Sequence, residues 1–417
     1  MKAFVLFFLL LAVAQAEPPP TLQLTLPQAL DLAEQANPDL RLVRQGVEVA
    51  RGGVTIAGQR PNPTLGLNTP IGPAERKQQV MFLVPLETGG RRDARLAVAE
   101  STVMEANLTT RQTRLTVLNG TRNAFVELAL SRATLDQSRK DVEFNDRVVT
   151  AAQHRFEAGE VAEAEVVRAK FEREQIKRLV YPAENRVEAA LVTLNRLLGQ
   201  PLDTPIETVD DGWLFPTVAD LKGPTWNLPD LPALTEMARK QRPDLALNAQ
   251  QSQTAQRQIQ LALANQAPAL SLQASLLYNP AMPAFTYLAG VQLELPWGSD
   301  RGGELEQAQA RREEAARREQ VAQATADQAV ALAWKKFEAA RRQLSHDLEV
   351  LKPQAERVLY LAEKIYDIGQ SDITEVLLVG QSVQRQRQLL LTDFALLHQA
   401  LGELELAINA NLVGGKP

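Results

Sequence analysis

The chain has 417 residues, a formal net charge of −5 and no cysteine. This length allows two or three domains; the lack of cysteine excludes disulfides, thiolate metal sites and cysteine nucleophiles; and the mild negative charge argues against a nucleic-acid partner. Aromatic residues are sparse at 5%, whereas Ala, Leu, Glu, Gln and Arg are abundant. This composition is typical of long helices in contact with one another.

The chain begins with the pattern of a secretory signal peptide, residues 1–16. Met1-Lys2 gives a positive start, residues 3–13 are almost all apolar, and Ala14-Gln15-Ala16 is a small-x-small cleavage site. We expect the mature chain to begin near Glu17 and to leave the cytoplasm; a short buried N-terminal segment is the alternative. No later segment is apolar for about 18 residues, so membrane insertion would require a closed β-barrel.

The rest of the chain is an internal duplication. The Pro-Asp-Leu of residues 38–40 recurs 205 residues later at 243–245, and Gly159 recurs 210 residues later as Gly369, within matching segments. Because the segment between the halves is rich in proline, we expect irregular structure there, with a short helix or strand. The predicted divisions are a first repeat at 17–200, a Pro-rich linker at 201–230, a second repeat at 231–410 and a C-terminal tail at 411–417.

Each half predicts the same order of elements. A short helix leads, at about 27–37 and 231–242, and a second helix follows the Pro-Asp pair. Two short strands come next, and then a very long helix, a Gly-containing break and another long helix. Pro182 lies inside the last helix of the first half and should bend it.

The long helices carry apolar residues at strict seven-residue steps. A sustained repeat of this length makes helices wrap around one another in a left-handed sense. Arg173 interrupts one row, and another consists of alanines, which let helix backbones approach closely. The rows are Leu128, Leu135, Val142, Val149 and Phe156; Val166, Arg173, Val180, Val187 and Leu194; Ala308, Ala315, Ala322 and Ala329; Leu344, Leu351, Val358 and Ile365; and Val376, Val383, Leu390, Leu397 and Leu404.

The predicted strands alternate between apolar and polar residues instead. The alternation runs through 64–68, 80–86, 270–276 and 287–295, and it is weakest in the second of these segments. Apolar-out and polar-in strands suit a membrane barrel, although two soluble hairpins are the alternative. Since about eight strands is the smallest usual number for a barrel, four strands from one chain cannot close one alone.

With these features together, the sequence resembles the TolC-like outer-membrane efflux channel family from about residue 22 to residue 409. The resemblance rests on the duplication, the strand pair before each long helix, and the two breaks at 155–161 and 366–373, which look like the family's periplasmic hairpin tips. Pro61-Asn62-Pro63 and the segment 85–92 look most like the cobalt–zinc–cadmium efflux branch.

The resemblance implies a mainly α fold with a membrane β-barrel. It implies a homotrimer in which long α-hairpins form a periplasmic α-barrel and each protomer gives four strands to a shared twelve-stranded barrel in outer-membrane lipid. Residues 201–230 would belong to an equatorial region. The channel would be a passive duct for small molecules or metal ions, and it would dock on a periplasmic adaptor that joins it to an inner-membrane efflux pump.

The same resemblance selects the candidate site residues. At the tips, Arg155, Ala158, Gly159, Ile368 and Gly369 are expected to dock the adaptor. The predicted periplasmic gate consists of Glu165, Asp372 and Glu375, whose positions suit the constricted end of the tunnel. A trimer would repeat Glu375 as a ring of three like charges that favours cations. An ordinary exposed helix residue is the alternative for Glu375.

Other functions find little support in the sequence. Three scattered histidines make a poor metal site, and no nucleophile–base constellation indicates an enzyme, so we expect no catalytic residue, no metal site and no cofactor. A periplasmic coiled-coil scaffold or adaptor is the alternative function. The alternating strands present in both halves argue against it.

Overall fold

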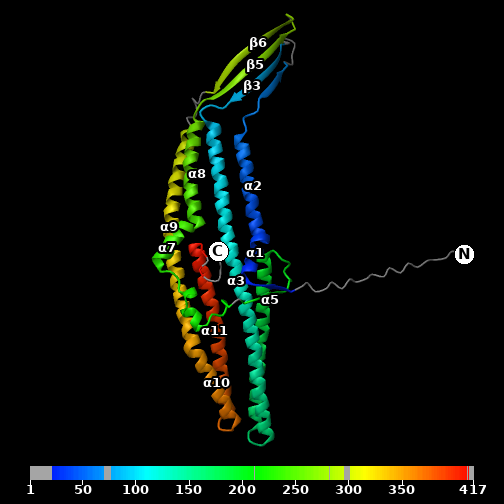
Figure 1. Cartoon of the computed structure of the whole chain (residues 1–417). Coiled ribbons are helices and arrows are strands. Elements are labelled where there is room, and N and C mark those ends of the chain that lie inside the picture. Colours follow the sequence, from blue (N-terminus) through cyan, green and yellow to red (C-terminus); the bar gives the residue numbers. More distant parts are fainter. Residues whose placement is uncertain are drawn as a thin grey trace, which may run out of the picture.

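The computed structural model describes residues 21–69, 77–210, 212–280, 282–294, 301–410 and 412. The predicted signal peptide lies outside these residues, as does the tail apart from Leu412. The molecule is elongated (Figure 1): a sheet lies at one end, helices run along the length, and two helical hairpins end side by side at the other end.

Both halves of the chain contain the predicted order of elements. The first half consists of β1 (Leu22–Leu24), α1 (Leu26–Ala36), α2 (Pro38–Gly58), β2 (Thr64–Asn68), β3 (Gln78–Leu86), α3 (Arg91–Glu157), α4 (Glu163–Arg178) and α5 (Val180–Leu198). The second half consists of α7 (Leu231–Gln241), α8 (Pro243–Asn265), β5 (Ala269–Asn279), β6 (Ala284–Glu294), α9 (Gly302–His346), η2 (Asp347–Leu351), α10 (Lys352–Asp367) and α11 (Ile373–Ile408).

The segment between the halves contains short elements, as its composition predicts. They are β4 (Ile206–Thr208), α6 (Val218–Lys222) and η1 (Pro224–Trp226). Strand β4 pairs in parallel with β1, which ties this segment to the start of the described chain. The buried Trp213 stacks edge-on against His398 of α11, with 4.7 Å between ring centroids. The segment is therefore fixed to the middle of the helical body.

The Pro-Asp pair starts the second helix of each half. Asn37 caps α2, because its side-chain oxygen accepts hydrogen bonds from the backbone N–H groups of Asp39 (2.9 Å) and Leu40 (3.1 Å). Pro38 and Pro243 stand at the first helical position, where the missing N–H is not needed. The duplicated sequence thus sets the same boundary twice.

The strands of both halves join in one antiparallel sheet. Its order is β2-β3-β5-β6, so that the first hairpin pairs with the second through β3 and β5. The predicted strands are confirmed, except that residue 295 lies outside the described part. All eleven residues of β6 are exposed. Among the described helices, none holds a stretch long and apolar enough to cross a membrane.

Pro182 interrupts its helix as expected. Helix α4 ends at Arg178 and α5 begins at Val180, with Leu179 between them at φ −72° and ψ −15°. The proline ring clashes with the carbonyl four residues earlier, which is that of Arg178. The break therefore falls one turn before the proline.

The seven-residue row from Leu344 to Ile365 does not stay in the core. Leu344 is fully buried, but Val358 and Ile365 are exposed, and their neighbours Leu359 and Tyr366 are buried instead. The cause is η2, a π-helical turn, which inserts one extra residue and rotates the following helix face by one position. The expectation of an unbroken row was wrong here. The row from Val376 to Leu404 keeps its buried face, with Leu390 only partly buried.

Candidate functional site at the hairpin tips

The two hairpin tips have the same backbone geometry. Gly159 and Gly369 adopt left-handed φ values of 75° and 73°. In each tip the glycine N–H bonds to the carbonyl three residues earlier at 2.9 Å, and the next N–H bonds to a carbonyl five residues earlier, at 2.9 Å from Glu160 and 3.0 Å from Gln370. This pattern closes the helix end and favours glycine, since other residues are strained at such φ values.

The tip residues predicted for docking divide into two groups. Ala158, Gly159, Ile368 and Gly369 are exposed at the ends of the hairpins, where a partner could reach them. Arg155 is mostly buried and lies over the ring of Tyr366, with 4.9 Å from the guanidinium carbon to the ring centroid. Arg155 therefore joins the first hairpin to the second.

A polar cluster forms around Tyr366 between the tips. Tyr366 is 2% exposed. Burial raises the pKa of its phenol, which the Arg155 guanidinium opposes, and the carboxylates of Glu165 and Asp372 act on it as well. Glu165 is half-buried, and its Oε2 has no hydrogen-bond partner. The structure thus brings Glu165, Arg155 and Tyr366 together within one protomer.

Asp372 and Glu375 lie at the start of α11. Asp372 caps this helix: its side chain accepts hydrogen bonds from the Thr374 N–H at 3.4 Å and from the Thr374 hydroxyl at 3.0 Å. Glu375 is in the first turn and is exposed. Both carboxylates sit near the positive end of the helix dipole.

Further contacts connect the two hairpins above the tips. Arg168 of α4 donates to the Thr374 hydroxyl at 2.9 Å, and Gln381 of α11 donates to Glu172 at 2.7 Å. Apolar packing accompanies them, centred on Phe144 of α3 and Val376 of α11. The hairpins are therefore held together by both polar and apolar contacts.

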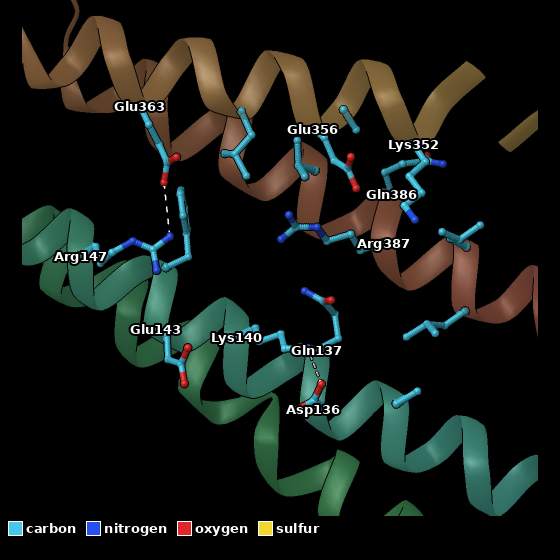
Figure 2. A pocket seen from close by; sticks show the side chains of 17 residues that line it. Asp136, Gln137, Lys140, Glu143, Arg147, Lys352, Glu356, Glu363, Gln386 and Arg387 are labelled. Carbon is cyan, nitrogen blue, oxygen red and sulfur yellow. Dashed lines mark hydrogen bonds and ion pairs between the residues drawn. The ribbon is translucent and has the colours of Figure 1, made fainter. Parts of the chain in front are cut away.

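A cavity of about 630 Å³ lies between α3, α10 and α11. Figure 2 shows charged side chains from both halves around it, with Arg147 reaching Glu363 at 3.4 Å. Its lining also includes Phe144 and Leu359. Within the described residues, no group of three or more His, Asp and Glu side chains is arranged to hold a metal ion.

Sequence reasoning missed Tyr366 and Arg168 as bridges between the hairpins. Their partners, Arg155 and Thr374, are about two hundred residues away in the sequence. The usable signal for Tyr366 was its place beside the glycine break, three residues before Gly369. The sequence offers no comparable signal for Arg168.

A duplicated chain with a shared sheet at one end and paired long hairpins at the other has the architecture of an elongated channel protomer. A family model for outer membrane efflux proteins matches residues 29–200 and 234–410, and the chain belongs to this family. The family consists of passive outer-membrane efflux channels and is not an enzyme family. The chain is accordingly a protein of the outer membrane, with its helical part in the periplasm.

The individual proteins that the chain resembles share 25% of its residues or fewer over the matched parts. The cobalt-zinc-cadmium resistance protein CzcC of Cupriavidus metallidurans is 25% identical over 177 residues, which is 42% of this chain and 42% of that protein. The chain therefore matches less than half the length of this curated relative. The structure of CusC superposes with a TM-score of 0.76 at 15% identity, covering 97% of this chain and 96% of that one. The outer membrane protein VceC of Vibrio cholerae gives a TM-score of 0.73 at 19% identity, with 93% and 96% covered.

Proposed function

We propose that this protein is the outer-membrane channel of a tripartite efflux system. It acts as a passive homotrimeric duct that receives small molecules or metal ions from an inner-membrane pump through a periplasmic adaptor. The observation that carries the proposal is the separation of two kinds of ends along one axis (Figure 1): the sheet at one end, and the exposed glycine turns of both hairpins at the other. A duct across the periplasm needs a membrane end and a docking end.

The trimer is supported by a helix face that is covered within the chain in the second repeat but exposed in the first. Within the chain, α8 lies between its own long helix α9 and α3 of the other repeat, whereas α2 contacts α3. Val49 of α2 corresponds to Thr254 of α8, 205 residues later, and Thr254 bonds to Glu105 of α3. On α2 this face is exposed and carries an apolar row at seven-residue steps, with exposures of 71% at Leu42, 76% at Val49 and 69% at Ile56.

The duplication also indicates what covers this row. If the pseudo-symmetry continues between copies, α2 should lie against α9 of a neighbouring copy as α8 lies against α3. Glu105 of α3 corresponds to Ala316 of α9, because the two helices begin 211 residues apart. Val49 of one copy should therefore meet Ala316 of the next. Burial of an apolar row of this kind favours association.

Cysteine crosslinking tests this arrangement directly, since the natural chain has no cysteine. In the outer membrane, the variant with both Val49→Cys and Ala316→Cys should form covalent trimers on mild oxidation, which denaturing gels would detect. Within one chain, α3 and α8 separate the two sites. The control pairs Arg51→Cys with Ala316→Cys, because Arg51 points to another side of α2 and bonds Glu48 at 2.7 Å. Monomers only from the first variant, or equal crosslinking in the control, would contradict the proposed trimer.

The tips would form the gate and the docking site of this duct. Arg155, Tyr366 and Glu165 tie the two hairpins of a protomer together. The contacts in this cluster would be lost if the two hairpins moved apart. The cluster therefore favours the closed state of the gate. The exposed residues Ala158, Gly159, Ile368 and Gly369 would meet the adaptor. Asp372 and Glu375 would surround the axis at the narrow end.

The cargo class is proposed from a relative. CzcC is described as a cobalt-zinc-cadmium resistance protein, and divalent metal ions are therefore the first cargo to test here. Deletion of the gene should sensitise its host to these ions, and the intact gene should restore resistance. Unchanged metal tolerance together with new sensitivity to organic compounds would favour small molecules instead.

A further inference from the structure

Two buried carboxyl groups face each other above the hairpin tips. Asp347 of η2 is 8% exposed and Asp393 of α11 is 4% exposed. Element η2 packs against α11, and the side chain of Asp347 is near enough to that of Asp393 to raise the pKa of the Asp393 carboxyl. Gln343 of α9 donates to Asp393 Oδ1 at 2.6 Å, but no described donor reaches Asp393 Oδ2. A proton held between the two carboxyls would satisfy this oxygen, whereas two buried carboxylates would repel each other.

The pair lies where the second repeat departs from the first. Asp347 is the first residue of the π-helical turn, and such turns often occur at functional positions. Counted from the tips, at an offset of 210 residues, the first repeat has Gln137 and Ala183. Counted from the starts of α3 and α9, at an offset of 211 residues, it has the exposed Asp136 and Pro182, and α3 continues without a π turn. Only the second hairpin, which leads to the tip with Asp372 and Glu375, contains this pair.

The charged groups on the surrounding elements are engaged elsewhere. Burial and Asp347 together raise the pKa of Asp393, and Gln343 lowers it; no basic group contributes. Lys352 of α10 points into the separate cavity of Figure 2. Four other groups have their own partners: Glu349 with Lys222 at 3.0 Å, Arg387 of α11 with Asp141 of α3 at 3.6 Å, Arg341 of α9 with Glu338 at 3.1 Å, and His398 of α11 with the Leu214 carbonyl at 2.7 Å. His346, which precedes Asp347 in the chain, is exposed to solvent.

We propose that Asp347 and Asp393 form a proton-operated clamp that holds the π-helical turn of the second hairpin against α11. With one proton shared between the two carboxyls, the clamp is closed. When the proton leaves, repulsion between two buried carboxylates pushes η2 away from α11. Because η2 continues into α10, the change loosens the second hairpin above its tip, while the first hairpin has no such carboxyl pair at the matching positions.

The direction of the pH effect follows from the raised pKa. The pKa of Asp393 rises from 3.8 to about 7 in the folded chain. Between these values the folded chain binds a proton that the unfolded chain does not, so the clamp contributes stability at low pH and loses it as the pH rises through about 7. One linked proton changes the local opening equilibrium by at most about tenfold per pH unit.

Amide hydrogen exchange on the detergent-solubilised full-length protein tests the clamp. After correction for the intrinsic exchange rate, protection of peptides covering 343–352 should fall from about pH 5 to about pH 7, by up to about tenfold per pH unit, and should level off above the pKa of Asp393. Asp393→Asn should abolish this slope, because it removes the carboxyl that takes up the proton. Asp347→Asn should reduce the slope, because burial alone still raises the pKa of Asp393 but the second carboxylate no longer adds to it.

The matched control is Glu349→Gln, which removes an exposed carboxylate from the same turn. It should keep the wild-type slope. Peptides from the first hairpin that exclude Asp141, whose own pKa is raised by burial, should show no such pH dependence in any variant. A wild-type segment with constant protection, an unchanged slope in both asparagine variants, or loss of the slope in Glu349→Gln would each overturn the clamp.

Discussion

At the scale of single residues, the two hairpins approach closely at Gly380 of α11. A Cβ placed on this glycine would lie 2.8 Å from Cε1 of Phe144, which belongs to α3 in the other repeat. Real Cβ atoms do not come so close to ring carbons, so the ring would have to move within a packed cluster. The two hairpins can pack at this distance because Gly380 has no side chain.

We therefore expect Gly380→Ala to destabilise the protein despite the better helix propensity of alanine. Overpacking costs about 1–3 kcal/mol, whereas replacing a helical glycine by alanine gains about 1 kcal/mol, so the net change should be a loss of up to about 2 kcal/mol. Thermal unfolding in detergent would measure it. Phe144→Leu in the same chain should restore part of the loss.

The control for this variant is Gly120→Ala in α3, where the nearest atom would lie 3.9 Å away. This change should leave the unfolding temperature unchanged or raise it. If both variants behave alike, the close approach at Gly380 does not limit the packing.

The site residues differ in how far the sequence could predict them. Gly159 and Gly369 stand out, because a glycine between two seven-residue rows predicts a turn from local information alone. The partnership of Arg155 with Tyr366 depends on the meeting of two helices from different repeats. No local pattern encodes that meeting. The same holds for Asp347 and Asp393, which in sequence are only two acidic residues among many.

At the scale of elements, local backbone chemistry decided what could be predicted. Pro182 predicts the break between α4 and α5, because the clash of the ring with the preceding turn is a property of proline itself. The π-helical turn at Asp347–Leu351 has no such signal, and it shifted the buried face from Ile365 to Tyr366. A prediction from seven-residue steps assumes an unbroken α-helix. One inserted residue is enough to place the predicted core positions on the wrong face.

The glycine turns at the two tips can be tested by substitution. Changing both Gly159 and Gly369 to valine should strain two turns at φ values of 75° and 73°, at a cost of about 1–3 kcal/mol each. Efflux and crosslinking to the adaptor should be lost, while trimer formation and membrane insertion, which depend on distant surfaces, should persist. Normal adaptor crosslinking in this variant would show that docking occurs elsewhere.

At the scale of the whole molecule, the duplication explains why one chain can serve as a third of a ring. Each repeat contributes two strands and one long hairpin, and the two hairpins end at the same level (Figure 1). The arrangement of elements was therefore predictable from repeated sequence. Three differences between the repeats were not, and they lie in the second hairpin: the π-helical turn, the carboxyl pair above the tip, and the capped helix start at Asp372.

The proposed ring at the narrow end gives the last prediction. Glu375 is exposed in the first turn of α11, and threefold symmetry would gather three such carboxylates around the axis. Their field should attract cations and give divalent ions a binding position that blocks current. In planar-bilayer recordings, Glu375→Gln should therefore reduce cation selectivity and weaken divalent block. Glu165→Gln should have a smaller effect on both, because Glu165 is half-buried beside Tyr366 and does not face open solvent. Unchanged selectivity and unchanged block in the Glu375→Gln channel would mean that these carboxylates do not line the constriction.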